Sequence, residues 1–540
     1  MKSSSGRRGV AIITALFVVM LVTTLVTLTL SEARRSLEIT RFAAARTEAY
    51  FRARSAVERG LKSLNEQPLW ESTHEGPGAA QETFDGTCRT WVETVNSERL
   101  YLLAEARVGE VRVQSCQVIL RKRPVDALTL ALWKPDGPDT VLFKKASEAD
   151  WNHAGPPPRM FWDKDGSGNW TVPQTITYGD GKPKYVNDLE MVTGDSQGNL
   201  YAVWTRDGEA DMVFKFDGDT QEWTLLPGVP RMVFSAGQFQ PNGELVGSLD
   251  HLASNGDKLL YALNEQDGVD AISVLDVDDT NTGWKTLPPM PKRIWNKSQN
   301  RWDEYPDSFA KSTKRVSADA DGNVYARFSV EDKPDTIYRF VPQADDPSQG
   351  EWQCLPPIPD GYWDLQADGN HQFQLDGGFV GKSKQLTVSP EGQVVVRQSR
   401  SGVDTHYVFV AEGGPTEGSF ERPGHWEPIR PAPRVYFDSS GARHEEDGVS
   451  GDFKNSAVDQ AGGLLTQWAR GGLDTLFRYD FPEKEWKDLP PIPKVRYDVD
   501  ANHDLVPQQY PGEFIGAVEG LGGGGIADLT RWEYQRGGSY

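Results

Sequence analysis

Cysteine and histidine are scarce in this sequence, which has 3 Cys and 8 His in 540 residues. Three cysteines exclude a disulfide-dense scaffold and a four-cysteine zinc site. Positive charge is outnumbered as well, because 57 Lys and Arg stand against 78 Asp and Glu, a net charge of −21. We therefore expect no nucleic-acid partner. The histidines are scattered, no catalytic constellation is recognisable, and we predict that the chain is not an enzyme.

Glycine, proline and aromatic residues are abundant instead, with 53 Gly, 35 Pro, 17 Trp, 17 Tyr and 22 Phe. Such a composition is typical of many short strands joined by tight turns. The 38% hydrophobic and 25% charged residues indicate a globular protein. The length allows three or four domains or one large β architecture.

One long run lacks charge entirely, the 21 residues of Val10–Leu30. As a helix this run spans about 30 Å, the hydrocarbon thickness of a membrane. Its threonines can bond to carbonyls one turn back. The basic start, residues 1–9, favours a cytoplasmic N-terminus. A secretory signal peptide and an ordinary uncleaved anchor remain alternatives.

The helix is expected to continue beyond the apolar run. Small and apolar residues recur at three- and four-residue spacings, which indicates a packing stripe for a head domain or sibling helices. Pro68 is expected to end the helix. The members of this stripe are Phe42, Ala45, Ala49, Ala53, Ala56, Val57, Leu61 and Leu64.

Arg7-Arg8-Gly9-Val10, the apolar run and the segment Arg41–Leu61 together resemble the class III signal and long helix of type IV pilin-like proteins. The K-type minor pseudopilins of type II secretion and the PilX-type minor pilins are the most similar. The resemblance implies cleavage between Gly9 and Val10 by a prepilin peptidase, with the apolar helix retained. It also implies a single-pass protein of the bacterial inner membrane whose C-terminal part is periplasmic or extracellular, with other minor pilins or pseudopilins as partners.

The fifth residue after the implied cleavage point departs from the common pattern. Most members of the family carry Glu there, whose carboxylate can neutralise a neighbouring N-terminal amine in low dielectric. This chain has Thr14. The K-type subunits also lack the Glu, so the resemblance favours a minor or tip subunit over a bulk subunit.

Residues 68–124 are predicted to form a small β domain. Three segments with a period of two, 88–95, 100–108 and 111–120, indicate three antiparallel strands. Cys88 and Cys116 fall on the first and the third, and we predict a disulfide between them outside the cytoplasm. Two buried hydrophobic residues are the alternative. Cys354 is expected to be a free thiol.

An internal repeat occupies most of the remaining chain. A Trp followed by a proline-rich segment, in its clearest form Leu-Pro-Pro-x-Pro, ends each copy, and an Asp precedes an apolar strand inside it. Trp151 and Trp486 are 335 residues apart, so five intervals average 67 residues. The six Trp are Trp151, Trp223, Trp284, Trp352, Trp426 and Trp486, and the six Asp are Asp139, Asp211, Asp270, Asp335, Asp404 and Asp474.

About four strands per copy predict a β-propeller over residues 125–540, because a ring hides the edges of its sheets. A linear β-solenoid is the alternative. The repeat resembles a degenerate kelch repeat. Because a partial C-terminal copy lies around Trp532, the sequence predicts either six or seven blades. The predicted fold is mainly β: a leader (1–9), a long transmembrane helix (10–67), a small β domain (68–124) and the propeller.

Two glycine patterns are expected to be turns. Gly194–Gly198 matches the nucleophile-elbow pattern G-x-S-x-G, but a strand follows it where that motif needs a helix. Gly520–Gly525 matches G-x-G-x-x-G without a following helix, and we expect a flexible turn.

Two acidic loops place oxygen ligands at alternate positions, as a calcium loop requires. One contains Asp498, Asp500, Asn502 and Asp504, and the weaker one contains Asp163, Asp165 and Ser167. Calcium is therefore a candidate ligand, with solvated turns as the alternative.

Two functions remain at this point. The first is a minor pilin-like protein of a type IV pilus or a type II secretion pseudopilus, which displays the propeller for adhesion, priming or binding of a protein or surface. The second is a periplasmic sugar-binding or hydrolytic propeller that uses the helix only as an anchor. A polar or acidic cluster on one face of the propeller would favour the second.

Overall fold

The computed structural model describes residues 5–66, 80–83, 87–96, 99–109, 111–122, 125–171, 173–205, 209–264, 268–343, 346–365, 371–400, 403–412, 420–469, 472–527 and 531–534. The chain forms two compact units. Unit 1 comprises Met1–Pro124 and Leu529–Tyr540, and unit 2 comprises Val125–Asp528. The predicted mainly-β fold with one long N-terminal helix is confirmed.

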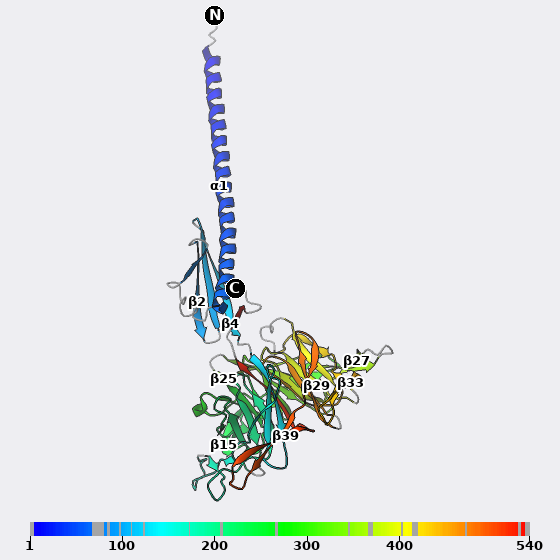
Figure 1. Ribbon diagram of the computed structural model, residues 1–540. Coiled ribbons are helices and arrows are strands. Elements are labelled where there is room, and N and C mark those ends of the chain that lie inside the picture. Colours follow the sequence, from blue (N-terminus) through cyan, green and yellow to red (C-terminus); the bar gives the residue numbers. More distant parts are fainter. Residues whose placement is uncertain are drawn as a thin grey trace. The chain divides into compact units, whose positions relative to one another are not determined.

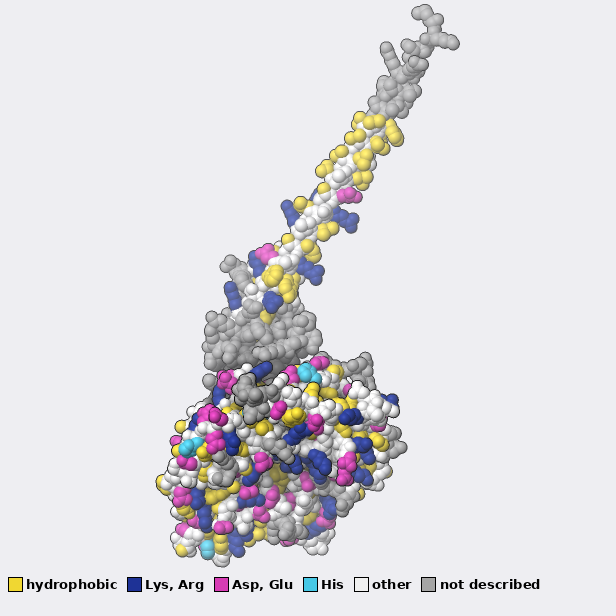
Figure 2. All heavy atoms as spheres, turned by 90° about the vertical axis from the view of Figure 1, so that its right-hand side faces the viewer, with side chains coloured by type: hydrophobic (Ala, Val, Ile, Leu, Met, Phe, Trp, Pro, Cys, Tyr) yellow, Lys and Arg dark blue, Asp and Glu magenta, His cyan; other side chains and the backbone are white. Residues whose placement is uncertain are grey.

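Helix α1 (Ser5–Glu66) is unbroken over 62 residues and ends just before Pro68, as predicted (Figure 1). The large hydrophobic side chains from Leu16 to Leu30 are 52–69% exposed, and Figure 2 shows hydrophobic side chains over much of this part of the helix. Thr23 and Thr27 donate to the carbonyls of Val19 and Thr23, at 2.7 and 2.8 Å. These bonds satisfy the hydroxyls inside an apolar surface, as expected.

The C-terminal part of α1 packs on an antiparallel sheet in unit 1. Ala49, Ala53 and Ala56 are fully buried against this sheet, which confirms the central part of the predicted stripe. Phe42 is 58% exposed and does not belong to it. The strand order is β1-β2-β3-β4-β41, with β1 (Gln81–Thr83), β2 (Cys88–Asn96), β3 (Arg99–Val108), β4 (Val111–Lys122) and β41 (Arg531–Tyr534).

The register of this sheet is incompatible with the predicted disulfide. Cys88 lies opposite Ala106, whereas Cys116 lies opposite Leu103. The intervening strand β3 separates the two cysteine-bearing strands, and the residues of β3 that pair with Cys88 and Cys116 are three positions apart along it. Strands two apart are about 10 Å from each other, beyond disulfide reach. Cys88 is a free buried thiol, and so is Cys354, as predicted for the latter.

Unit 2 is a six-bladed β-propeller of four-stranded antiparallel sheets. Blade 1 has β40 (Gly520–Ala527), β5 (Val125–Trp133), β6 (Thr140–Lys145) and β7 (Asn152–Ala154). Blade 2 has β10 (Leu189–Gly194), β11 (Leu200–Trp204), β12 (Met212–Phe216) and β13 (Trp223–Leu225). Blade 3 has β16 (His251–Ser254), β17 (Leu259–Asn264), β18 (Ala271–Asp276) and β19 (Lys285–Thr286).

The other three blades follow the same order. Blade 4 has β22 (Thr313–Ala318), β23 (Val324–Phe328), β24 (Thr336–Gln343) and β25 (Asp346–Cys354). Blade 5 has β28 (Ser383–Val388), β29 (Val394–Gln398), β30 (Thr405–Ala411) and β31 (Gly424–Ile429). Blade 6 has β34 (Phe453–Val458), β35 (Leu464–Trp468), β36 (Thr475–Asp480) and β37 (Glu485–Asp488).

Each blade is followed by a separate two-stranded hairpin, which explains why the repeat is so long. Each copy therefore has six strands rather than the four expected. The last proline of the Trp-Pro motif is the first residue of the hairpin in five copies, a position where a strand tolerates proline. The pairs are β8 (Met160–Phe161) with β9 (Gln174–Thr175), β14 (Pro230–Ser235) with β15 (Gln238–Leu245), β20 (Pro291–Asn296) with β21 (Arg301–Phe309), β26 (Pro359–Leu365) with β27 (His371–Phe379), β32 (Pro433–Phe437) with β33 (Arg443–Val449), and β38 (Pro493–Val499) with β39 (Leu505–Phe514).

The ring closes by sharing blade 1 between the two ends of the propeller sequence. The C-terminal strand β40 pairs with β5 and packs beside β10 and β34. This closed ring excludes the solenoid alternative. The glycines of β40 are therefore not a flexible turn: a Cβ on Gly522 would lie 2.6 Å from the Val192 carbonyl oxygen, and one on Gly523 would overlap that of Val458. The partial copy around Trp532 is not a blade, because β41 belongs to the sheet of unit 1.

The six repeat aspartates join neighbouring blades. Each lies just before the third strand of its blade and accepts a backbone N–H at the start of the inner strand of the next blade. The donors are Leu189 to Asp139 (2.6 Å), Leu249 to Asp211 (2.6 Å), Thr313 to Asp270 (2.6 Å), Ser383 to Asp335 (2.7 Å), Phe453 to Asp404 (3.0 Å) and Val518 to Asp474 (3.0 Å). We call these contacts the aspartate latches.

The six repeat tryptophans join the blades in the other direction. Each indole N–H donates to a carbonyl in the proline-rich segment of the preceding repeat. The acceptors are Pro490 for Trp151 (3.3 Å), Gly155 for Trp223 (2.6 Å), Pro227 for Trp284 (2.7 Å), Pro288 for Trp352 (2.9 Å), Pro356 for Trp426 (2.8 Å) and Arg430 for Trp486 (2.6 Å). The repeated Trp and Asp are thus explained by contacts between blades rather than by chemistry.

Candidate functional site: the central channel of the propeller

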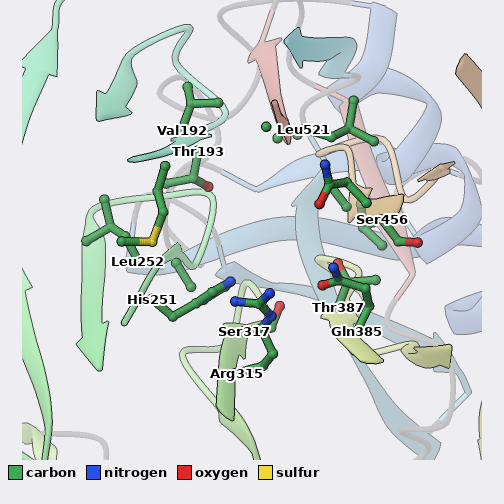
Figure 3. A pocket seen from close by; sticks show the side chains of 18 of the residues that line it. Val192, Thr193, His251, Leu252, Arg315, Ser317, Gln385, Thr387, Ser456 and Leu521 are labelled. Carbon is green, nitrogen blue, oxygen red and sulfur yellow. The ribbon is translucent and has the colours of Figure 1, made fainter. Parts of the chain in front are cut away.

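The inner strands of the six blades enclose a central channel. Neighbouring inner strands pack side by side around the whole ring. They leave a cavity of about 250 Å³ lined by strand residues of all six blades (Figure 3). Glycines of β40 line one side of it without side chains.

Polar side chains converge in the part of the channel formed by blades 3, 4 and 5. His251 and Arg315 point toward one another, with Gln385 beside them (Figure 3). The His251 side chain is half-buried, because one side of it borders the hollow channel while protein atoms surround the rest. That burial, with the nearby Arg315 guanidinium, lowers the pKa of His251 to about 3. The imidazole is neutral at pH 7, and its Nδ1 has no hydrogen-bond partner within the described part of the chain.

The carboxylate of Glu190, which lines the channel, is neutralised by a lysine of the same chain. Glu190 on β10 bonds to the ammonium of Lys134 at 3.0 Å, and the same ammonium lies 3.1 Å from Asp188. Burial alone would lower the pKa of Lys134, but the hydrogen bonds that its ammonium donates to Glu190 and Asp188 raise it. The lysine is therefore a fixed positive charge at this edge of the channel.

A second cavity, of about 340 Å³, lies between blades 4 and 5. Burial raises the pKa of Asp319 to about 6. Burial, with the neighbouring Arg339 guanidinium, lowers the pKa of Arg422. The cavity combines carboxylates and guanidiniums along its walls, so no single charge dominates it.

Burial also raises the pKa of the latch residue Asp139 to about 7, against the opposing effect of the Leu189 N–H. The pKa of this carboxyl is higher in the folded state than in the unfolded state. Its contribution to the stability of the fold is therefore fully present below the pKa of the unfolded state, and it is lost as pH rises through the pKa of the folded state. Asparagine keeps an acceptor oxygen without a charge. Asp139→Asn should therefore gain stability relative to the wild type between pH 5 and pH 8, by up to about 1.4 kcal/mol per pH unit. Urea unfolding at both pH values measures this, and a constant difference would refute the pKa shift.

The first predicted calcium loop is the turn between β38 and β39. Asp500 accepts the backbone N–H groups of Asn502 and Asp504, at 2.8 and 2.9 Å. Asp504 pairs with Lys182 at 2.6 Å, and Asp498 pairs with Arg496 at 2.8 Å. The carboxylates are therefore directed to different partners and do not converge.

The second predicted calcium loop is a turn of the same kind. Asp165 accepts the N–H groups of Ser167 and Asn169, at 2.8 and 2.9 Å, and Asp163 accepts that of Lys164 at 2.8 Å. Within the described ranges, no group of three or more His, Cys, Asp or Glu is placed to hold a metal ion. The structure gives these loops the geometry of turns closed by their own aspartates.

The G-x-S-x-G segment is also a turn, as predicted. Asp195 accepts the N–H groups of Gln197 and Asn199, at 2.8 and 3.0 Å, and Gly198 has a φ of +88°. Gly9 and Val10, the predicted processing residues, lie in the backbone of α1, and their side chains fall outside the described residues.

Sequence reasoning missed the channel residues altogether. His251, Arg315 and Gln385 occupy the same place in successive copies, two residues after the N–H group that is held by an aspartate latch. The distance along the chain from the latch aspartate to this place varies from 40 residues, between Asp211 and His251, to 50 residues, between Asp335 and Gln385, so an alignment of the copies on the latch aspartates brings these residues together only when the length of each hairpin is known. The blade topology needed for such an alignment became visible only with the structure.

No known family model matches the chain, and comparison with functionally curated proteins gives no match. Among solved structures, the chain is similar to TolB from Acinetobacter baumannii, with 10% identity, a TM-score of 0.32, and coverage of 75% of this chain and 79% of that chain. It is also similar to the β-propeller domain of the trilobed protease from Pyrococcus furiosus, with 9% identity, a TM-score of 0.26, and coverage of 74% and 93%. A third is a putative 6-phosphogluconolactonase from Bacteroides fragilis, with 13% identity, a TM-score of 0.31, and coverage of 67% and 94%.

Proposed function

We propose that the protein is a minor pilin-like subunit of a type IV pilus or type II secretion pseudopilus that displays a β-propeller for adhesion, priming or protein binding. The observation that carries the proposal is the division of α1 into two parts. One part exposes its large hydrophobic side chains, and the other buries small residues against an antiparallel sheet. A helix that is apolar on all sides over about 20 residues needs lipid or sibling helices around it.

The exposed part of α1 suits a membrane. One helix, Leu16–Val57 within the described residues, is long and apolar enough to cross a membrane. The proposal places the N-terminus in the cytoplasm, the helix in the bacterial inner membrane and the propeller in the periplasm or outside the cell. Its proposed partners are a prepilin peptidase and other minor pilins or pseudopilins, and Thr14 in place of the common Glu favours a position at the filament tip.

A second candidate function is a membrane-anchored propeller that binds a sugar or hydrolyses a substrate, with α1 serving only as an anchor. The polar cluster of His251, Arg315 and Gln385 in the channel favours this candidate. Processing of the N-terminus discriminates between the two, because a simple anchor needs no prepilin peptidase.

Replacing Gly9 with valine should block maturation, since the peptidase would meet a branched side chain at the cleavage point. The wild-type chain, expressed with a prepilin peptidase, should begin at Val10, and the Gly9→Val chain at Met1 or Lys2. Gly6→Val is the matched control and should mature normally. Intact-mass measurement of the purified chains decides, and equal processing of the wild type and Gly9→Val would refute the pilin proposal.

A further inference from the structure

The face of α1 that packs on the sheet of unit 1 continues along the helix beyond the sheet. Residues separated by alternating steps of three and four share one face of a helix. This spacing is unbroken over eight positions of α1. Four of them, Ala49, Ala53, Ala56 and Gly60, are buried against the sheet, and the other four are Arg35, Ile39, Phe42 and Arg46.

The second set of four residues, which we call the bare face, is exposed. Ile39 is 61% exposed and Phe42 is 58% exposed. The arginines at its two ends, Arg35 and Arg46, are exposed as well, and neither has an ion pair with any residue that the structure describes. The bare face therefore presents two large apolar side chains between two positive charges that the protein itself does not neutralise.

Lipid reaches only the first residue of the bare face. With Val10–Leu30 in the hydrocarbon core, Arg35 lies about 8 Å beyond the core at 1.5 Å per residue. Phe42 lies about 18 Å beyond it and Arg46 about 24 Å. The headgroup layer on each side of the core is about 5–8 Å thick. Phe42 and Arg46 are therefore too far from the membrane to be covered by it.

A second copy of the chain is a poor occupant of the bare face. The same apolar run inserts every copy at the same depth and in the same orientation, so two α1 helices would lie parallel and in register. In parallel helices that pack with this spacing, equivalent positions of the two chains face each other. Arg35 would meet Arg35 and Arg46 would meet Arg46, and such like-charge contacts act against that partner.

We propose that the bare face binds a parallel helix of a different single-pass membrane protein. Carboxylates of that helix face Arg35 and Arg46, and they are 11 residues apart, as positions 35 and 46 are. Its apolar side chains cover Ile39 and Phe42. Arginine can hold a carboxylate with two parallel hydrogen bonds, and a charge pair at each end of the contact fixes its register. The inference rests on the membrane insertion of α1 in the proposed function and names the chemistry of the partner.

The test uses two fluorescein-labelled peptides of residues 10–48 as probes. The native probe has the sequence of the chain, and the acidic probe carries Arg35→Glu and Arg46→Glu. Each probe is titrated with the full chain at physiological salt in a large excess of zwitterionic detergent micelles, and binding is read from fluorescence anisotropy. The acidic probe should bind about tenfold or more tightly than the native probe, because attractive charge pairs replace repulsive ones at two positions.

Reversing the charges on the full chain should reverse this preference. A full chain with Arg35→Glu and Arg46→Glu should bind the native probe more tightly than the acidic probe. Arg46→Glu alone should weaken binding of the acidic probe severalfold. Arg41→Glu is its matched control, because Arg41 is also exposed but lies about 140° around the helix from Arg46. The control should leave the affinity for the acidic probe unchanged.

Equal affinity of the wild-type chain for the two probes would overturn the proposal. Tighter binding of the native probe would overturn it in favour of a second copy as the occupant, and binding of neither probe at micromolar concentration would overturn it as well. None of these results bears on processing at Gly9, which is read from the mass of the mature chain.

Discussion

Replacing Asp404 with alanine is expected to destabilise the propeller by about 3–5 kcal/mol. Asp404 is completely buried, pairs with the buried Arg397 at 2.7 Å, and holds the Phe453 N–H of blade 6 at 3.0 Å. Arg397 also donates to the carbonyls of Phe453 and Lys454. Removal of the carboxylate leaves a buried guanidinium without its counter-charge and breaks the contact between blades 5 and 6.

Urea unfolding of the full chain in detergent measures this loss. Asp219→Ala is the matched control, because Asp219 is exposed in the turn after β12 and is not a latch residue. The control should stay within about 0.5 kcal/mol of the wild type. If Asp404→Ala were as mild as the control, the aspartate latches would not hold the blades together.

Replacing Ala53 with aspartate should separate α1 from the sheet of unit 1. Ala53 is fully buried in the cluster that also contains Ala49, Val92 and Leu102. An uncompensated buried charge costs about 3–5 kcal/mol. Gly60 shows how close this contact is, since a Cβ there would lie 2.8 Å from the Thr90 methyl group.

Hydrogen exchange of β2 and β3 measures the separation. A loss of about 3 kcal/mol corresponds to exchange roughly 100-fold faster, while exchange in the propeller strands should stay unchanged. Ala44→Asp, at an exposed position of the same helix, is the control and should leave β2 and β3 protected. Unchanged exchange in Ala53→Asp would show that the helix is not held by this packing.

The sequence was sufficient to predict the parts of the fold that repeat or that have a strong period. The Trp and Asp of each copy recur because every blade makes the same contact with its neighbour, so self-comparison finds them. The run of 21 uncharged residues and the alanine stripe both predict a helix, because neither has the period of two that is typical of a strand. The six hairpins were missed as separate sheets because a blade strand and a hairpin strand show the same period of two.

Contacts that depend on register could not be predicted. Cys88 and Cys116 are on the first and third strands as expected, but their pairing partners on the strand between them, Ala106 and Leu103, are three positions apart. Asp500 has the spacing of a calcium ligand, yet its carboxylate closes its own turn. Gly522 and Gly523 suggested a turn by composition, whereas their absent side chains let β40 fit between β10 and β34. The channel residues carry no local motif at all.

The mature N-terminus tests the central claim, that α1 is a processed pilin-like helix. The wild-type chain would be expressed in two strains that differ only in the presence of a prepilin peptidase, and its N-terminal peptide would be identified by mass spectrometry. The account predicts a chain that begins at Val10 where the peptidase is present and at Met1 or Lys2 where it is absent. The same N-terminus in both strains, or one beyond Leu30, would contradict it.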